Sequence, residues 1–191
     1  MKRQTKMRLF VAIDINKKLC SAVGELQQKC KSRMKDQSGL KWVDPELMHL
    51  TLKFLGEVDE NRIEDINQAV EVACLGKEPF EFDFSLIGTF GRPAKILWLG
   101  SEKQNVNLAK LATDIENALQ NLGFEKEQRE FNAHLTLARI KNRSIDKTLQ
   151  QLVNDFSKIN LPIISVDSVC LYKSQLTLDG PVYTLLKKFE L

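Results

Sequence analysis

Histidine and cysteine are scarce in this chain. Among its 191 residues there are two histidines and four cysteines, and no two cysteines have the Cys-x-x-Cys spacing of a zinc or redox site. Long apolar runs are absent as well, since the stretch from Leu9 to Ile13 ends at Asp14 and is too short for a signal peptide or a membrane span. We therefore expect a cytoplasmic protein with no membrane association and with reduced cysteines in its core.

Neither positive nor negative charge predominates in the chain. The net charge is +3, from 28 basic and 25 acidic residues, which does not by itself indicate a nucleic-acid-binding surface but permits a local phosphate-binding patch. No glycine-rich phosphate loop is present, because Gly88–Gly91 lacks the Lys-Ser/Thr ending and is expected to be a turn. Two basic clusters stand out: a predicted solvated helix face (Lys29, Lys31, Arg33, Lys35) and a group that closely follows His134 (Arg139, Lys141, Arg143).

The apolar pattern predicts an α+β protein. Strand-like segments cover residues 8–14, 41–43, 47–55, 80–87, 95–100, 131–140, 163–172 and 182–189. Helical spacing runs from residue 16 until Gly39, then over 59–74, 108–122 and 146–156. Strands joined by hairpins favour antiparallel sheets with helices outside. No flexible linker interrupts the chain, so we expect one domain over 1–191, with lobes of roughly 1–76 and 77–191 that can exchange strands.

Both histidines lie in the same tetrapeptide, His-Leu-Thr-Leu, at residues 49–52 and 134–137. In a strand, alternate side chains share a face, so each copy places histidine and threonine together and buries the two leucines. One copy alone would be an ordinary amphipathic strand. Because histidine exchanges protons near its pKa of about 6.5, two matched copies predict an acid and a base, His49 and His134, with Thr51 and Thr136 beside them on the same face.

A metal site is not expected. Two histidines are too few ligands, and no acidic residue lies at helical or strand spacing to complete a site with them, so neither a metal nor another cofactor is predicted. The large aromatic residues Trp42, Trp98 and Tyr183 are expected to pack in the fold rather than to serve as platforms for bases.

Residues 42–58, WVDPELMHLTLKFLGEV, resemble the first signature of the 2H phosphoesterases, and specifically of the RNA 2′,3′-cyclic phosphodiesterases, also called 2′-5′ RNA ligases. The likeness spans nearly the whole chain. It differs at Ala133, where the family usually has proline before the second histidine. The other matching segments, in order, are RLFVAIDI at 8–15, KILWLG at 95–100, HLTLARIK at 134–141, Ser174, Gly180-Pro181 and Tyr183.

The resemblance implies a bilobal, pseudo-twofold 2H phosphoesterase fold, in which two antiparallel sheets line a central groove. It also implies a hydrolase that opens the 2′,3′-cyclic phosphate at an RNA 3′ end and leaves a 2′-phosphate, with Thr51 and Thr136 as hydrogen-bond donors to that phosphate. We expect the protein to be a monomer. Phe54 and Arg139, each five residues after a histidine, match nucleoside-binding positions, and Arg139 can also bind phosphate. Strict alternation would turn both away from the histidine face, so we expect a bulge or strand end in each strand.

Other activities use the same residues. A reversible 2′-5′ RNA ligase would run through the same histidines, although the absence of a nucleotide-activating lysine motif argues against ATP-driven joining. A phosphodiesterase for another cyclic nucleotide is a further alternative. A noncatalytic nucleotide- or RNA-binding module is the remaining one, but binding alone does not need two proton-transfer groups.

Overall fold

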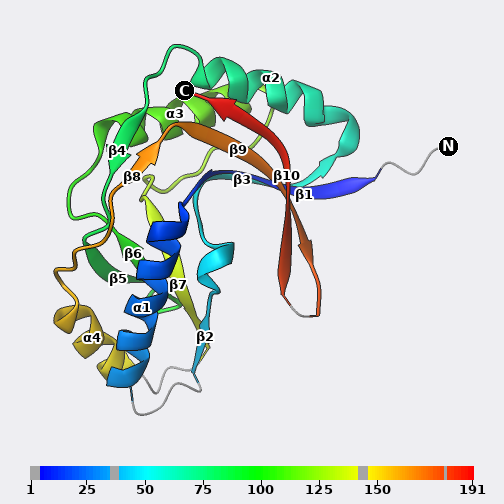
Figure 1. Cartoon of the computed structure of the whole chain (residues 1–191). Helices are drawn as coiled ribbons and strands as arrows, with labels where there is room; N and C mark the ends of the chain where they lie inside the picture. Colours follow the sequence, from blue (N-terminus) through cyan, green and yellow to red (C-terminus); the bar gives the residue numbers. More distant parts are fainter. Residues whose placement is uncertain (1–4, 35–38, 142–145, 179) are drawn as a thin grey trace.

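The computed structural model describes residues 5–34, 39–141, 146–178 and 180–191. Its architecture is α+β, as predicted, with two four-stranded antiparallel sheets and one small two-stranded sheet (Figure 1). The first sheet has the order β10-β9-β1-β3: β10 (Pro181–Glu190), β9 (Ser168–Leu176), β1 (Lys6–Asp14) and β3 (His49–Asp59). The second has the order β2-β7-β6-β5: β2 (Leu40–Trp42), β7 (His134–Ile140), β6 (Ile96–Gly100) and β5 (Leu86–Phe90). The small sheet pairs β4 (Phe80–Phe82) with β8 (Ile164–Val166).

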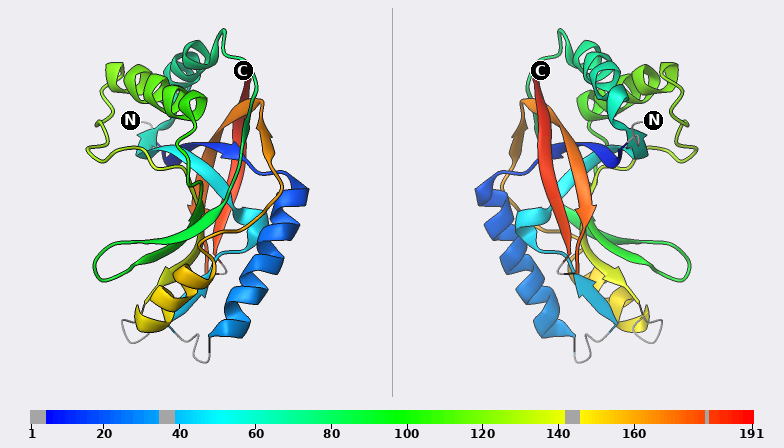
Figure 2. Two further views of the ribbon diagram at one scale, coloured as in Figure 1. Left: turned by 90° about the vertical axis from the view of Figure 1, so that its left-hand side faces the viewer. Right: turned by 90° about the vertical axis from the view of Figure 1, so that its right-hand side faces the viewer.

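The helices lie outside the sheets. In Figure 2, α2 and α3 gather at one end of the molecule over the first sheet, and α1 and α4 at the other end beside the second sheet. None of the described helices has the length and hydropathy needed to cross a bilayer. Their bounds are α1 (Lys17–Arg33), α2 (Ile63–Cys74), α3 (Val106–Asn121) and α4 (Asp146–Asp155), with short 3-10 turns η1 (Pro45–Leu47) and η2 (Glu60–Arg62).

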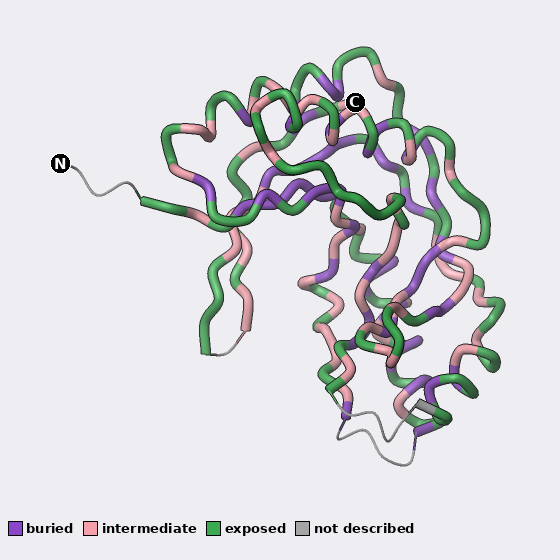
Figure 3. The backbone as a smooth tube through the Cα atoms, turned by 180° about the vertical axis from the view of Figure 1, so that it is seen from behind, coloured by how far each residue is buried: buried purple, intermediate pink, exposed green. Residues whose placement is uncertain are grey.

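Neither large sheet is built from one half of the chain. Strand β2 comes from the first half but pairs with β7, whereas β9 and β10 come from the second half and extend the sheet of β1 and β3. The helices are exchanged in the same way, since α3 packs on α2 and β3 and α1 lies against the second sheet (Figure 1). The two lobes therefore interlock, and one apolar core continues through both. Figure 3 shows buried residues in each lobe.

Helix α1 is fixed to the strand that carries the second histidine. The Asn16 side chain accepts a hydrogen bond from the Leu19 amide at 2.9 Å and thereby caps the helix start. Gln27 is 3% exposed, and its amide donates to the carbonyls of Val43 (2.8 Å) and Leu137 (3.1 Å). A buried amide with good partners specifies one arrangement of the elements that it joins, so α1 is held against β7.

Several sequence expectations are met and others corrected. All four cysteines are free and buried, as predicted. The expected strands 80–87 and 163–172 are each divided, because the chain changes sheet between β4 and β5 and again between β8 and β9. Residues 88–90 lie in β5 rather than in a turn, which begins at Gly91 with φ +92°. Asp59 precedes η2 but its side chain makes no capping bond.

Candidate active site

The two histidine strands have the same pattern of exposure. In β3 and in β7, histidine and threonine are half-buried, the leucines after each of them are buried, the next residue is buried and the fifth residue after histidine is exposed. The shared segments are His49–Phe54 and His134–Arg139. The sequence repeat is therefore also a repeat in three dimensions.

In β3, a bulge places Phe54 on the histidine face. Thr51 pairs with Ala12 and Lys53 with Val11, so Leu52 has no partner of its own. One extra residue reverses the alternation of side chains beyond it. Phe54 is 68% exposed and its ring lies 6.1 Å from that of Phe10. The expected bulge is confirmed here.

In β7, a bulge at the equivalent position does the same for Arg139. Thr136 pairs with Trp98 and Ala138 with Leu97, which leaves Leu137 as the extra residue. Arg139 is exposed and lies on the face of His134 and Thr136. Of the basic cluster around it, Lys141 is exposed. Arg143 lies outside the described residues, as does Lys35 of the first cluster.

Each imidazole is oriented by a backbone carbonyl two residues earlier in the chain. His49 Nδ1 donates to the Leu47 carbonyl at 3.1 Å, and His134 Nδ1 donates to the Asn132 carbonyl at 2.7 Å. A carbonyl oxygen can only accept, so the proton of each neutral ring is assigned to Nδ1. This leaves Nε2 of both rings as the atom that can take or give a proton.

Burial changes the acidity of both rings. Desolvation lowers the pKa of His49 and that of His134, and the backbone hydrogen bonds to Leu47 and Asn132 partly offset this effect. The Asp14 charge also raises the pKa of His49. The free protein therefore favours neutral imidazoles more than water does.

Aromatic rings surround His49. Phe10 stacks on the imidazole with centroids 4.6 Å apart, and Tyr183 meets it edge-on at 5.1 Å. Tyr183 therefore packs, as expected, but it packs against a proposed catalytic group. Phe10 was not predicted as part of the site. Its place in the alternating segment RLFVAIDI, on the same face as Asp14, was the available signal.

His134 has its own aromatic neighbours. Phe90 meets the imidazole edge-on at 4.9 Å and stacks on Trp98 at 5.0 Å. The indole lies against two glycines, since a Cβ added at Gly88 or Gly100 would come within 2.2 or 2.7 Å of its atoms. Trp98 thus packs as predicted, beside the site, and glycine at both positions provides the space that it occupies.

The two large sheets come together along the histidine strands. Strands β3 and β7 lie in contact although they belong to different sheets. Burial raises the pKa of Tyr183 on β10, and the charge of Arg139 on β7 partly opposes this rise. Arg139 is therefore near enough to influence an aromatic residue that contacts His49. The strands that carry the two histidine motifs therefore lie side by side.

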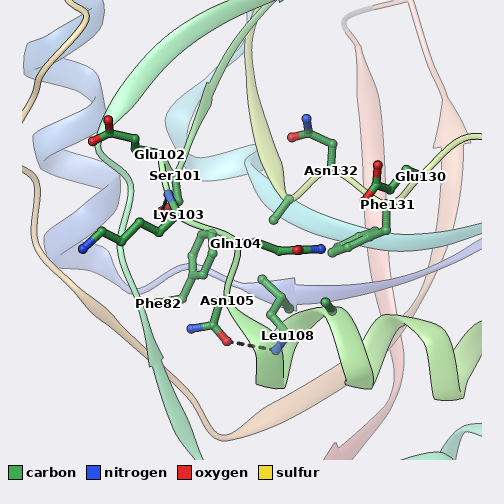
Figure 4. A pocket seen from close by; sticks show the side chains of 12 residues that line it. Phe82, Ser101, Glu102, Lys103, Gln104, Asn105, Leu108, Glu130, Phe131 and Asn132 are labelled. Atoms are coloured by element: carbon green, nitrogen blue, oxygen red, sulfur yellow. Dashed lines mark hydrogen bonds between the residues drawn. The ribbon is translucent and has the colours of Figure 1, made fainter.

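A cavity of about 330 Å³ lies next to the segment that leads into β7 (Figure 4). Asn132 and Ala133 line it, together with Asn105, whose side chain accepts from the Leu108 amide at 3.0 Å at the start of α3. None of the six predicted site residues is among the residues that form its walls. The cavity thus borders the segment that leads to His134, including Asn132, whose carbonyl orients the ring.

Within the described ranges, no three His, Cys, Asp or Glu side chains come together as a group that could hold a metal ion. The polar groups predicted for this site are two imidazoles, two threonine hydroxyls and one guanidinium.

A family model described as "LigT like Phosphoesterase" matches residues 13–98 and matches again over residues 99–183. The chain belongs to the LigT-like, or 2H, phosphoesterases. Each match contains one His-Leu-Thr-Leu motif, so the family model divides the chain into the two copies that the sequence repeat indicates. The resemblance identified from residues 42–58 and 134–141 is thereby confirmed.

Relatives that are named for an enzymatic activity match nearly the full chain. A protein of Thermotoga maritima named RNA 2′,3′-cyclic phosphodiesterase is 38% identical, covering 94% of this chain and 93% of its own. A protein of Methanocaldococcus jannaschii with the same name is 34% identical, covering 96% and 100%. The crystal structure of Escherichia coli LigT in apo form has a TM-score of 0.77 at 23% identity, covering 97% of this chain and 98% of that one, which supports the fold.

Proposed function

We propose that this phosphoesterase hydrolyses the terminal 2′,3′-cyclic phosphate of RNA to a 2′-phosphate, with His134 as general base and His49 as general acid. The observation that carries the proposal is the matched pair of histidines, each with Nδ1 bonded to a carbonyl and Nε2 left for proton transfer. The names of the full-length relatives supply the substrate class, and the family resemblance supplies the direction of ring opening.

The reaction needs two proton transfers. Nε2 of His134 takes a proton from water as the water oxygen bonds to phosphorus. The bond between phosphorus and O3′ breaks on the opposite side, and Nε2 of His49 gives its proton to O3′. One water is consumed, the 3′-hydroxyl is freed and the phosphate stays on O2′. Moving both protons during the reaction avoids forming free hydroxide or a free alkoxide.

The remaining side chains bind the substrate in this proposal. The hydroxyls of Thr51 and Thr136 donate to the nonbridging phosphate oxygens, on which charge develops in the transition state. Arg139 is exposed on the same face as His134 and forms charge-assisted bonds to phosphate or stacks on the base. Phe54, exposed on the face of His49, stacks on the terminal base, which holds a nucleotide without selecting its identity. Both motifs come from one chain, so a monomer carries a complete site. The four buried cysteines are free thiols, which is consistent with the reducing environment of the cytoplasm.

The direct test is phosphorus NMR of the protein with a short RNA that ends in a 2′,3′-cyclic phosphate, in EDTA. We expect the cyclic signal to be replaced by that of a 2′-phosphomonoester. The double variant His49→Ala/His134→Ala is the control and should leave the cyclic signal unchanged. A 3′-phosphomonoester would contradict the direction of opening. Binding without conversion would favour the noncatalytic module, and loss of activity in EDTA alone would contradict a metal-free reaction.

The rate should depend on pH as a bell-shaped curve. The base must be neutral and the acid protonated, so the rate falls below the lower apparent pKa and above the higher one, and both values belong to the coupled pair. Since burial lowers both histidine pKa values below the ordinary 6.5, kcat/KM should already be falling at pH 7. The kcat profile should lie at higher pH, because the bound phosphate anion favours the imidazolium form. Initial rates from pH 4 to 9 check both profiles, and a kcat/KM that rises through pH 8 would contradict the prediction.

A further inference from the structure

The two halves of the site differ at one position. His49 pairs across β1 and β3 with Asp14, and His134 pairs across β6 and β7 with Gly100. Directly paired residues of antiparallel strands project from the same face of the sheet. A carboxylate therefore accompanies the first imidazole, whereas the equivalent position beside the second has no side chain.

Contacts with β9 hold the Asp14 carboxylate in place. The Tyr172 hydroxyl lies 2.8 and 2.9 Å from its two oxygens, and the Cys170 thiol lies 3.6 Å from Oδ2. The same tyrosine ring stacks on Phe10 at 5.4 Å, and Phe10 stacks on His49. Desolvation and Asp14 together raise the pKa of Cys170 to about 12, so the thiol keeps its proton. Asp14 is thus oriented by neutral donors, and its negative charge is not cancelled by them.

We infer that Asp14 is a positioning residue for the reaction: its charge, beside His49 and absent beside His134, makes His49 the acid of the pair. The inference rests on the proposed function and explains why two otherwise identical motifs take different roles. A carboxylate near an imidazole stabilises the protonated form, which is the form that an acid must have before it gives its proton to O3′.

The packing around Trp98 explains why the half of the site that contains His134 has no equivalent of the Asp14 carboxylate. A Cβ at Gly100 would lie 2.7 Å from the indole and 3.1 Å from the Ala133 carbonyl oxygen. The ring itself is tightly held between Gly88, Gly100 and Phe90. No side chain fits opposite His134 without displacing the indole, so the asymmetry is built into the packing of the second sheet.

The other ionisable groups near His49 do not replace Asp14. Tyr183 of β10 contacts the imidazole, but burial raises its pKa, so it stays neutral. Arg139 of β7 acts on Tyr183, and a cation would favour the neutral imidazole rather than the imidazolium. Asp44 and Glu46 in the turn before β3 act on Cys20. Among the described residues, the charge that raises the His49 pKa is that of Asp14.

The test is Asp14→Asn, which keeps the size of the side chain and an oxygen that can accept from Tyr172. Because the tag-free chain has two histidines, NMR of the imidazole nitrogens follows each ring separately. We expect the His49 pKa to fall and that of His134 to stay. With a lower acid pKa, the alkaline limb of the rate profile moves to lower pH. Asp14 is exposed, so water screens its charge, and the rate on that limb should fall about 1.5- to 5-fold.

Controls separate the charge from other effects. Asp14→Glu should restore most of the His49 pKa and of the alkaline limb. Glu78→Gln makes the same charge change at an exposed position in the loop after α2 and should change neither. An unchanged His49 pKa in folded Asp14→Asn would overturn the inference. If the His49 pKa fell and the acid limb of the rate profile moved in place of the alkaline limb, the inference would also be overturned, because His49 would then be the base. The NMR titration does not require turnover, so the effect of Asp14 on the His49 pKa can be measured even if the protein does not catalyse the proposed reaction.

Discussion

Replacing either histidine with alanine is expected to lower turnover of a 2′,3′-cyclic phosphate at least about 100-fold and to leave the fold intact. Positioned proton transfer contributes roughly 10² to 10⁴ to a rate, and each ring supplies one of the two transfers. The rings are half-buried on the polar face of their strands, so their removal costs the core little. Initial rates give the loss in kcat, and circular dichroism with thermal unfolding checks the fold.

A matched pair of variants isolates the proton-transfer atom. In His49→Asn and His134→Asn, the side-chain amide can still donate to the carbonyl of Leu47 or Asn132, which replaces the Nδ1 bond. The atom that corresponds to Nε2 is lost. We expect these variants to be as inactive as the alanine variants and more stable to heat. A variant that keeps nearly the normal rate would rule out the paired acid and base.

Replacing Lys53 with alanine is expected to lower the free energy of unfolding by about 3 kcal/mol, since removing one member of a buried ion pair strands the other. Lys53 is 8% exposed. Its ammonium donates to Glu116 on α3 and to the Glu125 carbonyl, both at 2.5 Å. It follows the bulge residue of β3 and ties that strand to α3 and the loop after it. Urea denaturation of the normal and variant proteins measures the change.

Lys187→Ala provides the comparison for this effect. Lys187 on β10 pairs with Glu71 on α2 at 2.8 Å, across the same sheet and helix layers, but both side chains are much more exposed than those of the Lys53 pair. Exposed pairs contribute about 0 to 1 kcal/mol, so this variant should unfold at nearly the normal urea concentration. Equal losses in the two variants would show that burial does not decide the contribution of Lys53.

The local pattern predicted the face of each histidine strand but not the pairing between strands. Alternation and the repeated tetrapeptide placed His49 with Thr51, and the resemblance required the bulges that bring Phe54 and Arg139 to that face. The cross-strand neighbours Phe10, Tyr183 and Asp14 depend on register between distant segments, and a single sequence carries little information about register. For the same reason, the sequence allowed an exchange of strands between the lobes but did not show that β2, β9 and β10 are the strands exchanged. The catalytic roles remain predictions.

The exchanged strands also restrict how the enzyme can move. The chain crosses between the sheets before β3, and β9 and β10 return to the first sheet after the second is complete. Opening the lobes like a hinge would strain these crossings and the buried amide of Gln27, which joins α1 to Val43 and Leu137. We therefore expect the distance between His49 and His134 to change little through a catalytic cycle. RNA ends would enter and leave a site of nearly constant width, and selection of the substrate would rest on fit rather than on closure.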